Sequence, residues 1–243
     1  MQEIDLTKSK DVIGAYNSID FSYERKTYTD YGTQYCFNVL DGKIVAGYNI
    51  QLACFRHLRD LQRQGDSDFP YVYSVEAFNR FLKFLSLVPN VDDLSQKLEP
   101  MDWQYFIFAQ LFAWFDLDDV PRFSNIIISI ARSQGKTMIA GICLNFSYLI
   151  EIIGQSNQDF LVSSLNFDQT MKLFTYVKSM MARIIENEPF KSLAEETQLQ
   201  LYSREIKSLV DANTIHTISF ESGKFDGKHF KLAVADEVGE LRT

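Results

Sequence analysis

The sequence is poor in the residues that mark secreted, zinc-binding or membrane proteins. It contains three cysteines and three histidines in 243 residues. Cys36, Cys54 and Cys143 lie too far apart for the paired spacing of a disulfide framework or a zinc site. No apolar run reaches 18 residues, and the first residues lack the basic-then-apolar pattern of a secretion signal. We therefore expect a soluble, cytosolic protein with reduced cysteines and no membrane partner.

Net positive charge is also missing. The formal net charge is −8, and no long run of one sign interrupts the chain. A basic nucleic-acid-binding arm is thereby excluded, and any contact with DNA would need a local basic patch. With 46% hydrophobic residues, including 20 Phe, the chain has enough apolar surface for a sizeable core. Its length suits one large domain or one domain with a smaller companion.

The hydrophobic pattern changes along the chain. Residues 1–95 show mostly helical spacing of apolar side chains, which predicts a helical N-terminal lid or adapter region. From about residue 120, apolar strand-like segments alternate with helical ones, and this alternation is typical of a mainly parallel sheet covered by helices. We predict an α/β core over residues 96–243.

Residues 126–137 read IIISIARSQGKT. The β-branched run predicts a strand buried on both faces, and the apolar spacing after residue 136 predicts a helix. The polar residues between them, with one glycine, suit a tight loop. A strand, a loop and Gly-Lys-Thr at a helix start form the context of a phosphate-binding loop. The loop residues are Arg132, Ser133, Gln134 and Gly135.

Such a loop binds anions because its backbone N–H groups point inward and, together with the positive end of the helix dipole, form a nest for an anion. Lys136 would reach the β- and γ-phosphates of a nucleotide, and the Thr137 hydroxyl would bind Mg²⁺. Ile130 stands where the usual pattern has its first glycine, so only the second half of the motif is present. An ordinary solvated helix start therefore stays open as an alternative.

Two acids follow the last apolar segment. Residues 232–235 predict a small buried strand whose C-terminal end carries Asp236 and Glu237. In a sheet with a phosphate-binding loop, the first carboxylate at this position holds Mg²⁺, and the second can polarise the attacking water. Paired acids after a strand are also common in plain solvated turns. The loop upstream favours the catalytic interpretation.

Gln104 lies in the aromatic segment LEPMDWQYFIFAQLFAWF, ahead of the loop. Its side-chain amide offers a donor and an acceptor that match the edge of an adenine base. The alternative is an amphipathic helix with a surface glutamine.

Together these segments resemble the large terminase subunit of tailed bacteriophages, the motor that packages viral DNA. The resemblance rests on LEPMDWQ, on ARSQGKT as a deviant phosphate loop and on FDGKHFKLAVADE, with FLVSSLNFDQTMKLF between them. It extends from about residue 35 to the end. It implies a P-loop NTPase fold of the RecA-like (ASCE) class, ATP and Mg²⁺ as cofactors, and Gln104 as the adenine-binding residue. It also implies that Arg132 acts as an arginine finger on a γ-phosphate, within its own subunit or on a neighbour's, although a purely structural arginine is an alternative.

The resemblance further implies a pentamer docked on the portal protein of an empty procapsid, in the cytoplasm of the infected host. Double-stranded DNA and the small terminase subunit are the other implied partners. The family's nuclease domain is expected to be absent and the ATPase core to be C-terminally incomplete, because the sequence stops soon after Glu237. Gly239 stands where the family often has a histidine. Two other functions remain open: a helicase-like translocase, and a non-hydrolysing module that binds the portal.

Overall fold

The computed structural model of the protein describes residues 6, 10–90, 93, 95–222 and 229–238. Residues 225–228, which belong to the segment before the acidic pair, and Gly239 lie outside this part. The chain forms two compact units, one made of residues 1–82 and 100–127 and the other of residues 83–99 and 128–243. This spatial division does not coincide with the sequence boundary at residue 95, because residues 100–127 pack with the N-terminal helices. Each unit is described below by itself.

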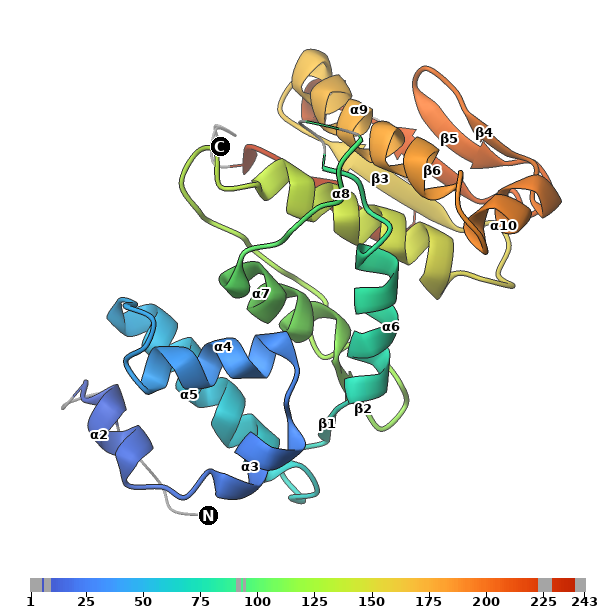
Figure 1. Ribbon diagram of the computed structural model, residues 1–243. Coiled ribbons are helices and arrows are strands. Elements are labelled where there is room, and N and C mark those ends of the chain that lie inside the picture. Colours follow the sequence, from blue (N-terminus) through green and yellow to red (C-terminus); the bar gives the residue numbers. More distant parts are fainter. Residues whose placement is uncertain (1–5, 7–9, 91–92, 94, 223–228, 239–243) are drawn as a thin grey trace. The chain divides into compact units, whose positions relative to one another are not determined.

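The first unit is mainly helical (Figure 1). Its helices are α2 (Val12–Asn17), α3 (Ser22–Thr27), α4 (Tyr31–Leu40), α5 (Tyr48–Arg63), most of α6 (Val75–Leu85) and α7 (Asp102–Phe112). The strands β1 (Tyr71–Tyr73) and β2 (Trp114–Asp116) pair in antiparallel fashion. The predicted helical N-terminal region is confirmed over α2–α6. Among the described residues, no helix is both long and apolar enough to cross a bilayer.

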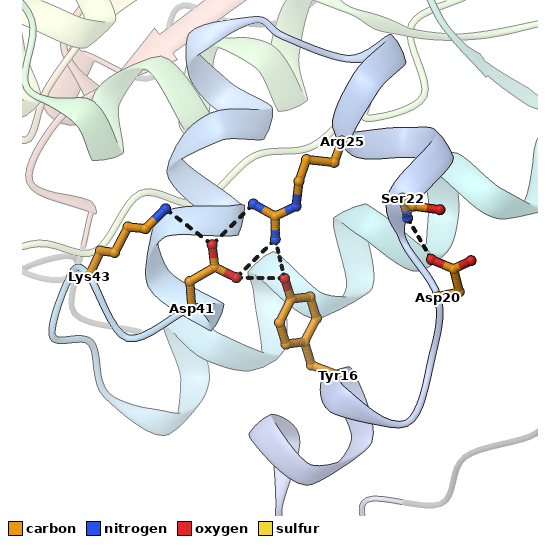
Figure 2. Close-up of polar contacts among 6 residues, drawn as sticks. All are labelled: Tyr16, Asp20, Ser22, Arg25, Asp41 and Lys43. Carbon is orange, nitrogen blue, oxygen red and sulfur yellow. Dashed lines mark hydrogen bonds and ion pairs between the residues drawn. The ribbon is translucent and has the colours of Figure 1, made fainter.

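A polar network joins three segments of the first unit. Figure 2 shows the Asp41 carboxylate, at the end of α4, between the guanidinium of Arg25 and the ammonium of Lys43. The Tyr16 hydroxyl donates to Asp41 and accepts from Arg25. Burial alone would raise the pKa of Asp41, but the bonds from Arg25 and Tyr16 outweigh burial and hold this pKa below its usual range. The network fixes α2 and α3 against the end of α4.

His57 is fully buried in the first unit. The Gln110 amide donates to its Nδ1 at 2.9 Å, and its Nε2 lies 3.0 Å from the Thr33 hydroxyl. A neutral ring with its proton on Nε2 satisfies both contacts. The rings of Tyr73 and Trp114 pack edge-on around it. Burial, aided by nearby arginine charges, lowers the pKa of His57 to about 3.

The second unit is built on a five-stranded sheet (Figure 1). Its strands are β3 (Asp159–Ser163), β4 (Leu199–Leu201), β5 (Glu205–Ser208), β6 (Thr214–Thr217) and β7 (Phe230–Ala235). The accompanying helices are α8 (Lys136–Phe146), the π-helix η1 (Ser147–Glu151), α9 (Phe167–Ile184), α10 (Phe190–Glu196) and the short 3-10 helix η2 (Phe220–Ser222). This is an α/β unit, as the sequence predicts.

The sheet is mixed rather than mainly parallel. Its strand order is β4-β5-β6-β3-β7. The central strand β3 pairs in parallel with β6 and with β7, whereas β4, β5 and β6 form an antiparallel meander. The meander arises because short turns join these strands, and a short turn can only reverse the chain. The alternation of apolar side chains in residues 199–210 and 213–220 predicts paired strands, and the antiparallel pairing of β5 with β6 confirms it.

The buried strand predicted at the start of IIISIARSQGKT is wrong. Residues 125–131 carry no strand, and Ile127 is 91% exposed. A β-branched composition fits a pleated surface but does not supply a hydrogen-bonded neighbour. Within the described residues, β7 pairs only with β3, and no ladder includes this segment. The apolar run is therefore extended but unpaired.

The spacing of Asn166 and Gln169, three residues apart, predicts a capping box at the start of α9, and the structure forms half of it. The Asn166 side chain accepts a hydrogen bond from the backbone N–H of Gln169 at 3.0 Å, as an N-cap should. The return bond of a capping box is missing, since the Gln169 side-chain oxygen is buried without a partner. A single cap, rather than the predicted box, defines this helix start.

Helices α8 and α9 are in close contact. The buried Asn145 side chain donates to the Gly141 carbonyl at 2.8 Å and, across to α9, to the Val177 carbonyl at 3.1 Å. A Cβ atom at Gly141 would lie 3.1 Å from the Met180 sulfur. The absence of a side chain at Gly141 therefore lets the two helices approach.

We predict that His57 makes the stability of the protein depend on pH. The unfolded ring gains a proton below about pH 6.5, whereas the folded ring stays neutral down to about pH 3, so acidification favours the unfolded state within this window. The free energy of unfolding should fall by up to about 1.4 kcal/mol per pH unit from this group. His57→Gln should be less stable at pH 7 and should have a shallower slope between pH 6 and 4, as measured by urea unfolding. An unchanged slope would contradict this account.

Candidate functional site

The predicted loop lies in the second unit and contains two residues with a left-handed backbone. Gly135 has a φ of 78° and occupies the N-cap position of α8, and Ser133 has a φ of 61°. Glycine adopts this left-handed conformation at no steric cost. No side chain caps α8, so its first backbone N–H groups are left for a ligand. Arg132, Ser133 and Gln134 are exposed in front of the helix.

Thr137 and Asp236 meet although 99 positions separate them. The Thr137 hydroxyl donates to Asp236 Oδ2 at 3.2 Å. Thr137 is in the first turn of α8, and Asp236 directly follows β7. The structure thus brings together the two residues that sequence reasoning assigned to the same metal.

The strand before the acids differs from its prediction. β7 begins at Phe230, and its side chains alternate between half-buried and exposed, so the expectation of a buried strand is wrong. Because β7 is the last strand of the sheet among the described residues, it is covered less than β3. Glu237 is exposed, and its backbone has a φ of 57°. The Glu237 N–H donates to Asp236 Oδ1 at 2.9 Å.

Gln104 belongs to the first unit, in the first turn of α7. It is 3% exposed, and its Oε1 accepts a hydrogen bond from the Met101 N–H at 2.9 Å. The side chain therefore closes the N-terminus of its own helix. The alternative of a surface glutamine is therefore wrong, because the cap draws the amide inward. Among the described residues, the Gln104 Nε2 group donates no hydrogen bond.

Ser164 was missed by sequence reasoning. It is fully buried just after β3, and its hydroxyl donates to the Asp236 carbonyl at 3.1 Å. The Asp236 N–H in turn donates to the Ser163 carbonyl. The pair of serines after an apolar strand was visible in the sequence, but nothing there indicated which later segment it would contact.

The donor set at Thr137 and Asp236 suits Mg²⁺. Both residues offer oxygen, the ligand that magnesium prefers, and magnesium keeps several waters or phosphate oxygens in addition to one or two carboxylates. No group of three or more His, Cys, Asp and Glu side chains forms a metal cluster in the described part of the chain. A hydroxyl and a carboxylate alone do not complete the coordination shell of Mg²⁺. Phosphate oxygens would complete it, which is consistent with a metal carried by a nucleotide.

Comparison with known families decides the assignment. The family model described as "Terminase large subunit, ATPase domain" matches residues 102–243, which include the loop, Thr137 and the acidic pair. The chain belongs to this family. ATP hydrolysis in the service of DNA packaging is the general role of terminase large subunit ATPase domains. The resemblance seen in the sequence is confirmed.

A solved structure supports the same fold. The crystal structure of the HK97 bacteriophage large terminase superposes with a TM-score of 0.52 at 19% sequence identity. The match covers 68% of this chain and 32% of that chain, so this chain spans about a third of the length of that terminase. No curated protein matches the sequence.

Proposed function

We propose that this chain is the ATP-hydrolysing motor part of a terminase large subunit, which drives double-stranded DNA into procapsids. The observation that supports this most directly is the hydrogen bond between Thr137 and Asp236, since it joins a helix-capping loop to an acidic strand end. The fold is then a P-loop NTPase of the RecA-like class with a helical lid or adapter, although its sheet is mixed. Its expected place is the procapsid portal in the host cytoplasm.

Each loop residue has a proposed task. The backbone N–H groups from Ser133 to Thr137 surround the phosphates of ATP, and the Lys136 ammonium neutralises their charge. Within the described residues Lys136 forms no ion pair, so its charge is free for a ligand. Thr137 and Asp236 would hold Mg²⁺, which would supply positive charge beside the phosphate oxygens.

Two charged side chains carry the chemistry in this proposal. Glu237 orients the attacking water and accepts its proton, and its exposed position after β7 leaves it open to a water molecule. Arg132 is exposed in the loop and, within the described residues, makes no ion pair. It offsets charge on the transferring phosphoryl group, in its own site or in that of a neighbour. An arginine finger that reaches a neighbour's site requires an oligomer. The proposed form is a pentamer docked on the portal protein, and the small terminase subunit is a further proposed partner.

We predict that Lys136→Ala abolishes ATP hydrolysis. A charge-assisted contact to the phosphates disappears, so turnover should fall by about 10²-fold or more and nucleotide binding should weaken. Phosphate release and binding of a fluorescent ATP analogue measure the two effects. Lys172→Ala, at an exposed position on α9, is the control. If the parent protein shows no turnover with or without DNA, the non-hydrolysing module is the better interpretation.

We predict that Glu237→Gln separates binding from hydrolysis. Glutamine keeps the shape of the side chain and leaves Asp236 to hold Mg²⁺, but it cannot accept a proton from water. The rate should fall by about 10²- to 10⁴-fold while the dissociation constant for Mg-ATP stays within a few-fold of the parent value. Loss of binding in this variant would indicate a structural role for Glu237.

We predict that Gln104 selects adenine through its amide N–H₂ group. Gln104→Glu keeps an oxygen to accept from the Met101 N–H, so the helix cap survives, but the donor to adenine is lost. The Michaelis constant for ATP should rise and the preference for ATP over GTP should shrink, with little change in the melting temperature. Gln104→Ala removes both groups and should also cost about 1 kcal/mol of stability. Equal use of ATP and GTP by the parent would remove the basis for this role.

A further inference from the structure

The peptide bond between Asp236 and Glu237 is held at both ends. Its carbonyl oxygen accepts a hydrogen bond from the Ser164 hydroxyl at 3.1 Å. Its N–H donates to Asp236 Oδ1 at 2.9 Å. A peptide unit is planar, so the two bonds on its opposite sides fix the rotation of the whole plane.

The rotation of this plane decides where Glu237 points. Glu237 has a φ of 57°, in the left-handed region that is unfavourable for a residue with a Cβ atom. Such a conformation persists only where the surrounding contacts impose it. With the preceding peptide fixed in place, this φ sets the direction of the Cα–Cβ bond of Glu237. Within the described residues, the Ser164 hydroxyl is the contact from outside the acidic pair that holds the peptide plane against rotation.

Ser164 is itself immobilised. It has no exposed surface, and its N–H donates to the Thr170 hydroxyl at 3.0 Å. The Thr170 hydroxyl donates to the Asn166 carbonyl at the start of α9, and the Ser164 carbonyl accepts from the Phe220 N–H at 3.0 Å. All three polar groups of Ser164 are therefore used. Its hydroxyl is presented to Asp236 from a rigid frame formed by β3, α9 and η2.

We propose that Ser164 is a positioning residue for Glu237. Its hydroxyl holds the Asp236–Glu237 peptide in the orientation that aims the Glu237 carboxylate at the attacking water. Ser164 has no exposed surface, and it acts through the backbone of the acidic pair. This inference rests on the proposed ATPase function. It adds a residue that influences the hydrolytic step and that follows β3, whereas the two acids follow β7.

The test compares two adjacent buried serines. Ser164→Ala removes the bond to the Asp236 carbonyl and should lower kcat for ATP by about 10- to 100-fold, the size of effect expected when a reacting group is misplaced by about 1 Å. The Michaelis constant and the affinity for Mg-ATP should stay as in the parent, because the loop, Thr137 and Asp236 are unchanged. Ser164→Thr retains a hydroxyl and should recover most of the rate.

Ser163→Ala is the matched control. The Ser163 hydroxyl is equally buried but donates to the Ile218 carbonyl at 2.6 Å, away from the acidic pair. This variant should lose a similar amount of thermal stability while keeping kcat within about twofold of the parent. If both alanine variants lower kcat equally, or if Ser164→Ala raises the Michaelis constant instead, the positioning role is overturned.

Glu237→Gln in the same assay separates this inference from the proposed function. If Glu237→Gln retains the parent rate, or the parent has none, the ATPase proposal itself fails. If Glu237→Gln stops hydrolysis while Ser164→Ala keeps the parent kcat, only the positioning role fails. A Ser164→Ala/Glu237→Gln double variant should be no slower than Glu237→Gln alone, because a positioning residue has no effect once the group that it positions is disabled. A further loss in the double variant would contradict the inference.

Discussion

The parallel pairing of β7 with β3 is the constraint on which the candidate site depends. In register, Ser163 lies beside Ala235, so both strands end at the same edge of the sheet. That common end places the acidic pair beside Ser164 and within reach of Thr137 at the start of α8. Ligands of open α/β sheets bind at the carboxyl ends of the strands for the same reason. A shift of one residue in this ladder would turn every side chain of β7 to the other face.

The two units use buried polar groups differently. In the first unit, His57 and the Asp41 network are internal contacts that tie helices together, and their altered pKa values follow from burial and from neighbouring charges. In the second unit, Thr137 and Asp236 are half-buried and Glu237 is exposed, and no side chain caps the first N–H groups of α8. The candidate site is therefore recognised by the geometry of the loop and of the strand end.

Local signals in the sequence predicted local structure well. The left-handed glycine, the helix after Gly-Lys-Thr and the Asn166 cap each depend on a few neighbouring residues, and each was predictable. The approach of Thr137 to Asp236 was predictable only through the motif that both belong to. The absence of strand pairing at residues 125–131 and the exposure of β7 could not be predicted from the sequence. Strand pairing depends on partners far away in the chain. Ser164 was missed for the same reason: its contact spans 72 positions.

The close approach of α8 and α9 has a mechanical consequence. Asn145 is completely buried and bonds the backbone of both helices, so sliding one along the other would break buried hydrogen bonds and leave polar groups unsatisfied. Gly141 lets the helices touch without an intervening side chain that could bend. The two helices therefore behave as one stiff body, and the loop at residues 132–135 is attached directly to the start of α8.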